Sequence, residues 1–316
     1  MRVGLVLGGG GVVGASWMVG ALQGLEDEAG FRLESATRIL GTSAGALVGT
    51  LGAAGVSPEE MGEYASGTAE HIVGAAAGPY NFSLWPLPLG FGSPRLAAAM
   101  LRQQRDRSLG ALLMGLLPRG IINTEPIHRL VERVAGTAWP DSPSLRVVAC
   151  DYASGQRVTF GSRRAPASSV GAAVAASCAI PAFFQPVTIG ERNYIDGGIH
   201  SHSNLDLIAG EELDLVVCLS PMSSRASTSA TTMLERIAAA RRRRASAAID
   251  NESRSLKRAG TRLVVLEPAL EDLHAMGSNP MARDRAERVI ATARETAASA
   301  VRSLSLDTAL SAASAG

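Results

Sequence analysis

The chain has 316 residues, of which 46% are hydrophobic and 19% charged, so it can bury a sizeable core as one large domain or two modest ones. Its formal net charge of +1 excludes a global attraction to nucleic acid or to anionic lipid, and any such partner would have to meet a local patch. Cys150, Cys178 and Cys218 are far apart and lie in no CxxC pattern or histidine cluster, so we expect neither a disulfide framework nor a zinc site.

Two stretches of about twenty residues, Val3 to Leu25 and Ile39 to Pro58, carry no charge and are long enough to be candidate membrane spans. Glycine clusters with Ser and Thr interrupt both stretches, and the first follows a single Arg2 without a small-residue cleavage site. We therefore expect no transmembrane helix, no signal peptide and a cytoplasmic location.

The opening letters "RVGLVLGGGG" predict a short apolar strand that runs into a glycine loop, and "VGASWMVGALQGLEDE" has helical spacing. The segment "ATRILGTSAGALVGTLGAAG" repeats this plan of strand, tight turn and small-residue helix. Two such units in succession predict an α/β fold with a parallel sheet, because parallel strands need crossover connections that place helices on the faces of the sheet.

We expect the region 57–145 to be a variable, helical and lid-like part of the chain, with helices at Glu59–Ala77, Pro94–Leu117 and Thr124–Ala135. A loop around Trp85, "PYNFSLWPLPLGFG", holds four aromatic residues among leucines and prolines. We favour packing over the core for this loop, with a lid or a contact with a membrane interface as the alternative.

The rest of the chain continues the alternation of strands and helices. "LRVVACDYASGQRVTFG" predicts two strands joined by a Ser-Gly turn, and the helix in "SSVGAAVAASCAIPAFFQPV" is expected to end at Pro181. Strands are expected in "NYIDGG", "LDLVVCLSP" and "TRLVVLEP", a loop and a basic helix within 222–258, a last helix at Asn279–Ser303, and a disordered tail at 303–316. The four consecutive arginines of the basic helix favour a solvated face over a patch for lipid phosphate or nucleic acid.

The first glycine loop raises a choice between two ligands. "GGGVVG", Gly9 to Gly14, fits the GxGxxG pattern of a dinucleotide site. That interpretation requires an acidic residue at the end of the second strand, where the ribose hydroxyls would be held. The second strand ends instead in Gly41, Thr42 and Ser43, which disfavours a nucleotide.

"GTSAG", Gly41 to Gly45, is a GxSxG sequence between a strand and a helix. In this arrangement a sharp turn exposes the serine and places its hydroxyl at a helix N-terminus, where backbone N–H groups favour developing negative charge. Ser43 is the candidate nucleophile. The alternative is that Thr42 or Ser43 only caps the following helix.

A nucleophilic serine needs a base. The chain has five histidines, but the serine comes too early for the usual order of an α/β-hydrolase. "YIDGG" offers Asp196, followed by Gly197 and Gly198, at an apparent strand end. A turn without a catalytic role is the alternative for this sequence. His200 and His202 follow closely, and we expect them to be turn residues without a role, with an influence on Asp196 as the alternative.

The combination of the three motifs resembles the patatin-like phospholipase family, as do "ASCAIPAFFQPVTIGERNYIDGGIHSHSNLDLI" and "LHAMGSNPMARDRAERVI". The resemblance implies a three-layer α/β/α domain over 1–302. It also implies that Ser43 attacks an ester carbonyl, that Asp196 takes up its proton, and that the N–H groups of Gly9, Gly10 and Gly11 hold the oxyanion.

The resemblance further implies a lipid ester substrate, with peripheral membrane contact as an open point, and no metal or cofactor. Val13 stands where many members of the family carry Arg or Lys, so the oxyanion would rely on backbone dipoles. Two alternatives remain at this point: a hydrolase of small soluble esters or thioesters, and a non-catalytic binding or regulatory protein on the same fold.

Overall fold

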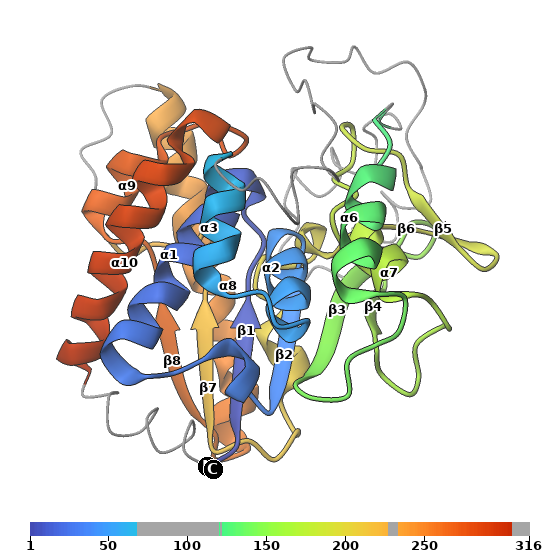
Figure 1. The fold of residues 1–316 in the computed structure, drawn as a ribbon, viewed down its shortest axis with the longest axis horizontal. Helices are drawn as coiled ribbons and strands as arrows, with labels where there is room; N and C mark the ends of the chain where they lie inside the picture. Colours follow the sequence, from blue (N-terminus) through green and yellow to red (C-terminus); the bar gives the residue numbers. More distant parts are fainter. Residues whose placement is uncertain (68–119, 121, 227–232, 305–316) are drawn as a thin grey trace.

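The computed structural model describes residues 1–67, 120, 122–226 and 233–304 (Figure 1). The expected helix at Pro94–Leu117, the loop around Trp85 and the tail from 305 onward lie outside the described residues. Most of the lid-like region therefore lies outside them as well.

A mostly parallel sheet forms the middle of the molecule, with the strand order β5-β6-β3-β2-β1-β7-β8 and with β4 paired to β3. The strands β2, β1, β7 and β8 run parallel to one another and to β3, whereas β4, β5 and β6 join antiparallel. The described strands are β1 (Val3–Leu7), β2 (Arg38–Thr42), β3 (Ser144–Asp151), β4 (Arg157–Phe160), β5 (Val187–Ile189), β6 (Arg192–Asp196), β7 (Leu215–Leu219) and β8 (Arg262–Leu266).

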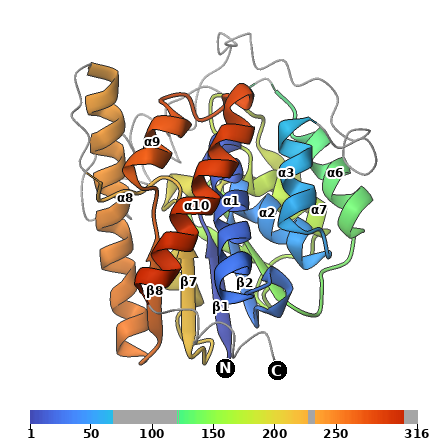
Figure 2. The same cartoon turned by 60° about the vertical axis from the view of Figure 1, so that its left-hand side comes forward.

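Helices cover both faces of this sheet because successive strand residues point to opposite sides. Leu5 and Leu7 of β1 join the large core cluster, whereas Val6 joins a second cluster with Ile249 and Leu256. The larger layer holds α1 (Gly11–Ala29), α2 (Ala44–Ala53), α3 (Pro58–Ser66), α6 (Glu125–Ala135), α7 (Val170–Ser177), α9 (Leu270–Met276) and α10 (Ala286–Ser303), and the other face is covered by α8 (Met233–Arg258). The expected three-layer α/β/α fold is confirmed (Figure 2).

Three expected helices are shorter than the sequence pattern indicated. The helix expected at Glu59–Ala77 ends at Ser66, because Gly67 takes a left-handed φ of 79°. The helix expected to reach Pro181 ends at Ser177, since a residue before proline is disfavoured in helical geometry. The last helix begins at Ala286 rather than Asn279, whose side chain accepts a hydrogen bond from the Met281 N–H in a local turn.

Among the described helices, none is at once long enough and apolar enough to cross a bilayer. The three cysteines are free thiols and are buried in the core.

Candidate active site

Two strands meet end to end along one edge of β3. Thr42, the last residue of β2, pairs with Val148 of β3, and Asp196, the last residue of β6, pairs with the next residue, Ala149. Because β4 occupies the other edge of β3 at these positions, β2 and β6 must share an edge. One runs parallel and the other antiparallel to β3, so their carboxyl ends face each other. The geometry therefore brings Ser43 and Asp196 together.

Ser43 lies in a sharp turn between β2 and α2. Its φ of 53° and ψ of −120° are rare for a residue with a side chain, and such strained positions cluster at functional sites. The flanking glycines are required by close approach: a Cβ at Gly41 would lie 2.5 Å from the Ala46 Cα, and one at Gly45 would lie 2.1 Å from the Leu7 carbonyl oxygen. The turn is thus held tightly over the ends of β1 and β2.

The side chains of Thr42 and Ser43 do not cap α2. Ser43 occupies the N-cap position, but its hydroxyl makes no capping bond and lies close enough to the carboxylate of Asp196 to lower the pKa of that group. The Thr42 Oγ1 accepts a hydrogen bond from the Asn204 Nδ2 at 3.1 Å. Neither hydroxyl is therefore engaged as a helix cap.

Asp196 is a buried carboxylate with only 4% of its surface exposed. Burial raises its pKa to about 6, although the nearby Ser43 hydroxyl and the hydrogen bond from the Gly198 N–H oppose that rise. The Gly198 N–H lies 2.6 Å from the Asp196 Oδ1. Gly197 passes so near β3 that a Cβ there would lie 2.5 Å from the Val148 carbonyl oxygen. An aspartate in this setting is a stronger base than an exposed one, yet remains ionised at neutral pH.

The first glycine loop lies directly against Ser43, since a Cβ at Gly9 would lie 3.3 Å from the Ser43 Cβ. The Gly9 N–H donates to the His202 carbonyl oxygen at 2.9 Å and is thus occupied. The N–H groups of Gly10 and Gly11, at the start of α1, have no hydrogen-bond acceptor among the described residues. These two N–H groups are therefore available as hydrogen-bond donors to a ligand.

Val13 is buried in the core, and its N–H donates to the Pro280 carbonyl oxygen at 3.0 Å. A Cβ at Gly11 would lie 2.8 Å from the same carbonyl oxygen. The segment before α10 therefore packs on the glycine loop, and the side chain at position 13 contributes packing rather than charge.

Ser177, at the end of α7, binds the backbone of the turn that contains Ser43. Its hydroxyl accepts a hydrogen bond from the Ser43 N–H at 2.8 Å and donates one to the Val148 carbonyl oxygen at 2.6 Å. Val148 is the β3 residue opposite Thr42. One fully buried hydroxyl thus fixes the backbone of Ser43 to the strand that sets its register.

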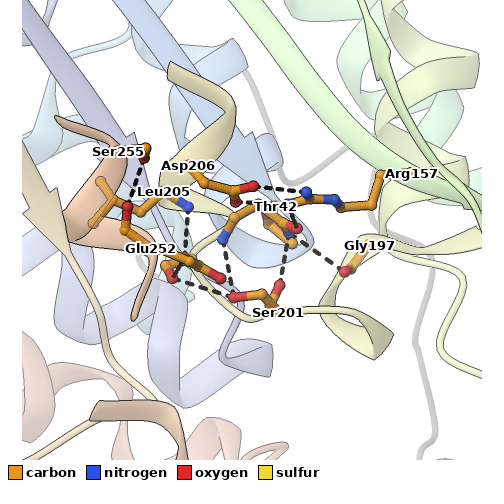
Figure 3. Close-up of polar contacts among 10 residues, drawn as sticks. Thr42, Arg157, Gly197, Ser201, Leu205, Asp206, Glu252 and Ser255 are labelled. Atoms are coloured by element: carbon orange, nitrogen blue, oxygen red, sulfur yellow. Dashed lines mark hydrogen bonds and ion pairs between the residues drawn. The ribbon is translucent and has the colours of Figure 1, made fainter. Parts of the chain in front are cut away.

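Asn204 links the two halves of the site through a buried polar network (Figure 3). Its side-chain Nδ2 donates to Thr42 Oγ1 and also lies 2.6 Å from the Ser201 carbonyl oxygen and 3.4 Å from that of Gly197. Its Oδ1 accepts from the Arg157 Nη1 at 3.2 Å. The residue before Ser43 and the residue after Asp196 are therefore bonded to one side chain.

The same network continues to α8. The carboxylate of Glu252 accepts from the Ser203 Oγ at 2.7 Å and from the Leu205 N–H at 2.8 Å. Arg157 forms two bonds of 2.7 Å with Asp206. The loop that follows Asp196 is thus anchored both to the sheet and to the helix behind it.

Sequence reasoning missed Ser177 and Asn204. Two signals were present: Ser177 is the polar end of an otherwise apolar helix, "VGAAVAAS", and Asn204 closes the polar run "HSHSN" after the DGG turn. A buried polar residue must find partners, so such isolated positions predict hydrogen bonds even when they cannot predict with whom.

His202 lies beside the site, whereas His200 is exposed at the end of the turn after Asp196. A Cβ at Gly9 or at Gly198 would come within 4 Å of the His202 Nδ1. Burial, followed by the charge of Arg241, lowers the pKa of His202 to about 4. His202 is therefore a neutral neighbour of the glycine loop at neutral pH.

A cavity of about 350 Å³ opens next to Ser43. Apolar side chains from α1, α2, α3 and α6 form most of its wall, including Val19, Leu47, Leu51, Met61 and Leu130. Its volume and apolar lining are those of a ligand-binding site. In the described part of the chain, no three Cys, His, Asp or Glu side chains gather as a metal site would require.

Comparison with known proteins gives the following matches. A family model described as patatin-like phospholipase matches residues 5–208, a range that contains Ser43 and Asp196. No curated protein sequence matches the chain. Among solved structures, VipD from Legionella pneumophila is similar with a TM-score of 0.41 and 14% identity, over 95% of this chain and 67% of that chain.

The type III effector protein ExoU is similar with a TM-score of 0.40 and 15% identity, over 96% of this chain. The chain spans 53% of the length of that ExoU chain.

Asn204→Asp tests the link between the two halves of the site. Aspartate also tolerates the left-handed φ of 49° at this position, but it removes the Nδ2 donor to Thr42 and Gly197. We expect the variant to fold and Ser43 to react with a fluorophosphonate about 10- to 100-fold more slowly, because the pair loses its alignment. Asn193→Asp, an exposed position on β6, is the matched control, and equal rates for both variants would contradict the role.

Ser177→Ala should leave the Ser43 N–H and the Val148 carbonyl oxygen without their partner, at a cost of about 1–3 kcal/mol in the free energy of unfolding. Urea unfolding measures that loss, and fluorophosphonate labelling well below the unfolding midpoint should also be slower. Ser253→Ala removes a buried hydroxyl that bonds only to its own helix and should leave labelling unchanged. A stability loss with an unaltered labelling rate would reduce Ser177 to a packing role.

Proposed function

The chain belongs to the patatin-like phospholipase family, which indicates a lipid acyl hydrolase, and on that premise we propose that it cleaves carboxylic ester bonds of lipids through Ser43 and Asp196. One observation carries the proposal: a strained serine, whose hydroxyl lies beside a buried carboxylate, borders an apolar cavity. A turn or a helix cap would need neither the strain nor the buried charge.

In the first step, the Ser43 Oγ attacks the carbonyl carbon of the ester as its proton passes to the Asp196 carboxylate. The new C–O bond turns the carbonyl oxygen into an oxyanion. Asp196 then gives the proton to the alkoxide as the bond to the alcohol breaks, so an acyl-serine forms and the alcohol leaves. This division of a difficult step into two easier ones is the use of a covalent intermediate.

The oxyanion would be held by the N–H groups of Gly10 and Gly11 at the start of α1, with the N-terminus of α2 adding to the positive field. Donors of this kind contribute about 3–4 kcal/mol each to lowering a barrier. Gly9 was expected to share this role, but its N–H would first have to leave the His202 carbonyl oxygen. We therefore assign the hole to Gly10 and Gly11, and regard Gly9 as the residue that lets the loop reach Ser43.

Water completes the cycle. Asp196 takes a proton from a water molecule, and the oxygen of that water attacks the acyl carbon. Asp196 then returns the proton to the Ser43 oxygen as the acyl-serine bond breaks. The fatty acid is released and both side chains are restored. Each step uses residues of this chain alone, and none calls on a metal or a cofactor.

Desolvation makes the dyad chemically reasonable. An exposed aspartate is too weak a base for a serine, but burial raises the pKa of Asp196 to about 6, near the operating pH of a general base. The apolar cavity beside Ser43 suits the acyl chain of a lipid.

The first test is a panel of phospholipids, lysophospholipids, glycerides and short-chain nitrophenyl esters, assayed with wild type, Ser43→Ala and Asp196→Asn. We expect hydrolysis of long-chain lipids by wild type and a loss of several orders of magnitude in kcat/KM in both variants, which circular dichroism should find folded. Activity confined to short chains would favour a hydrolase of small esters. No hydrolysis, together with no fluorophosphonate labelling of Ser43, would favour a binding protein.

The second test is pH. Because the pKa of Asp196 is raised to about 6, kcat/KM for a soluble ester should level off above neutral pH and fall about tenfold per unit below pH 6, as the base becomes protonated. A profile that falls only near pH 4 would contradict a desolvated base.

Thermal unfolding supplies the control for this pH dependence. A raised carboxyl pKa means that the folded state binds the proton more tightly, so the charged form destabilises the fold above pH 6. Asp196→Asn should therefore unfold at a higher temperature than wild type at pH 7.5, and the difference should shrink as the pH falls from about 6 towards 4.

A further inference from the structure

The first turns of α8 extend beyond the sheet. α8 connects β7 to the parallel β8, so it runs back along the sheet and begins at the carboxyl edge, where Ser43 lies. Its 26 residues span about 39 Å at 1.5 Å per residue, more than twice the length of a five-residue strand. The buried residues Ser246, Ile249 and Leu256 are in the later part of the helix, and the earlier part reaches past β7 and β8 (Figure 2).

The overhanging part exposes apolar side chains. Met233 is 74% exposed and Ile237 is 49% exposed, and residues four apart lie on the same side of a helix. The opposite side faces the protein, since the half-buried Arg242 donates to the Pro221 carbonyl oxygen at 3.1 Å. Two large apolar side chains therefore point directly away from the core.

Arginines flank this apolar strip on both sides. At 100° per residue, Arg236 and Arg243 fall on one side of the line through Met233 and Ile237, and Arg241 falls on the other, while Arg244 continues the line. All four arginines are exposed. Glu235, the acid of this stretch, is two positions from both apolar residues and so lies on the other side of the helix.

We propose that this surface, the exposed side of residues 233–244, docks onto a membrane that carries anionic phospholipid headgroups. Apolar side chains enter the boundary of the acyl region while flanking arginines bind phosphates, which is the arrangement of an interfacial helix. Solvation of the helix does not explain the exposed apolar side chains of Met233 and Ile237. Binding of nucleic acid does not explain why these two side chains lie between the arginines. The net charge of +1 makes such a local patch necessary.

The docking surface is close to the candidate active site. Arg241 is near enough to His202 to lower the pKa of that imidazole, and His202 lies beside Gly9. Arg242 binds Pro221, and Pro221 packs on the glycine loop, where a Cβ at Gly10 would lie 2.8 Å from its ring. A membrane bound here would lie at the edge of the sheet where the ester is cleaved, a consequence that rests on the proposed function, although binding itself does not.

The test uses the full chain with Ser43→Ala, so that vesicles stay intact. Sedimentation is measured with phosphatidylcholine vesicles that contain or lack phosphatidylglycerol. We expect binding only with the anionic lipid and a loss on the order of 100-fold for the triple variant, because each arginine near a charged surface adds to the attraction. That variant is Arg236→Gln/Arg243→Gln/Arg244→Gln.

A matched control removes the same charge from the far end of the same helix, at three exposed residues. It is Arg254→Gln/Lys257→Gln/Arg258→Gln, and it should bind as the parent does. Met233→Ser/Ile237→Ser should also weaken binding, whereas Leu270→Ser, another exposed apolar residue, should not.

Three results would overturn the proposal. The first is an equal loss of vesicle binding in both triple variants, and the second is no binding to anionic vesicles. The third is that Met233→Ser/Ile237→Ser changes neither the binding of vesicles nor the binding of duplex DNA. A dimer in light scattering that Ile237→Ser dissociates would assign the surface to a second copy. A control assay measures hydrolysis of a soluble nitrophenyl ester by chains that retain Ser43. We expect the same rate in both triple variants, so a failure of membrane binding can be told from a failure of the proposed chemistry.

Discussion

The pairing of β2 and β6 with one edge of β3 is the constraint on which the rest of the site depends. Since the two strands run toward each other, their last residues must leave the sheet at the same point, one on each side of the junction. The sharp turn at Ser43, the close glycines and the burial of Asp196 all follow from the lack of room there. The geometry of this junction is thus set by the sheet more than by the loops that leave it.

This junction is costly, and a polar network offsets the cost. A strained serine and a desolvated carboxylate each disfavour the folded state. Ser177 fixes the backbone of the first, and Asn204 connects the strand before Ser43 to the turn after Asp196. Glu252 extends the support to α8. The buried hydroxyl and amide groups thus find hydrogen-bond partners in one another.

The sequence allowed the alternation of strands and helices, both glycine-flanked motifs and the Asp196 turn to be predicted, because each is a local pattern with a steric or chemical reason. It did not predict that the Gly9 N–H would donate to the His202 carbonyl oxygen, or that Ser177 and Asn204 would bond to the segments that carry Ser43 and Asp196. Those contacts join residues far apart in the chain. Helix ends were misjudged where a single Gly67 or a turn at Asn279 overrides a continuing periodicity. Composition also could not tell a solvated basic helix from one with an apolar strip between its arginines, which depends on which side faces the core.

The pairing register on β3 makes the distance in space between Ser43 and Asp196 independent of their separation in the sequence. About 150 residues lie between Ser43 and Asp196, yet their approach is set by two consecutive residues, Val148 and Ala149. The connection between β2 and β3 can therefore change in length without moving the pair, provided that α2, α3 and α6 keep their places. Removing one residue from β6 would instead turn the carboxylate to the other face of the sheet, together with the other side chains of that strand. The approach of Ser43 to Asp196 thus tolerates a change in the length of the covering segments but not a one-residue shift of β6.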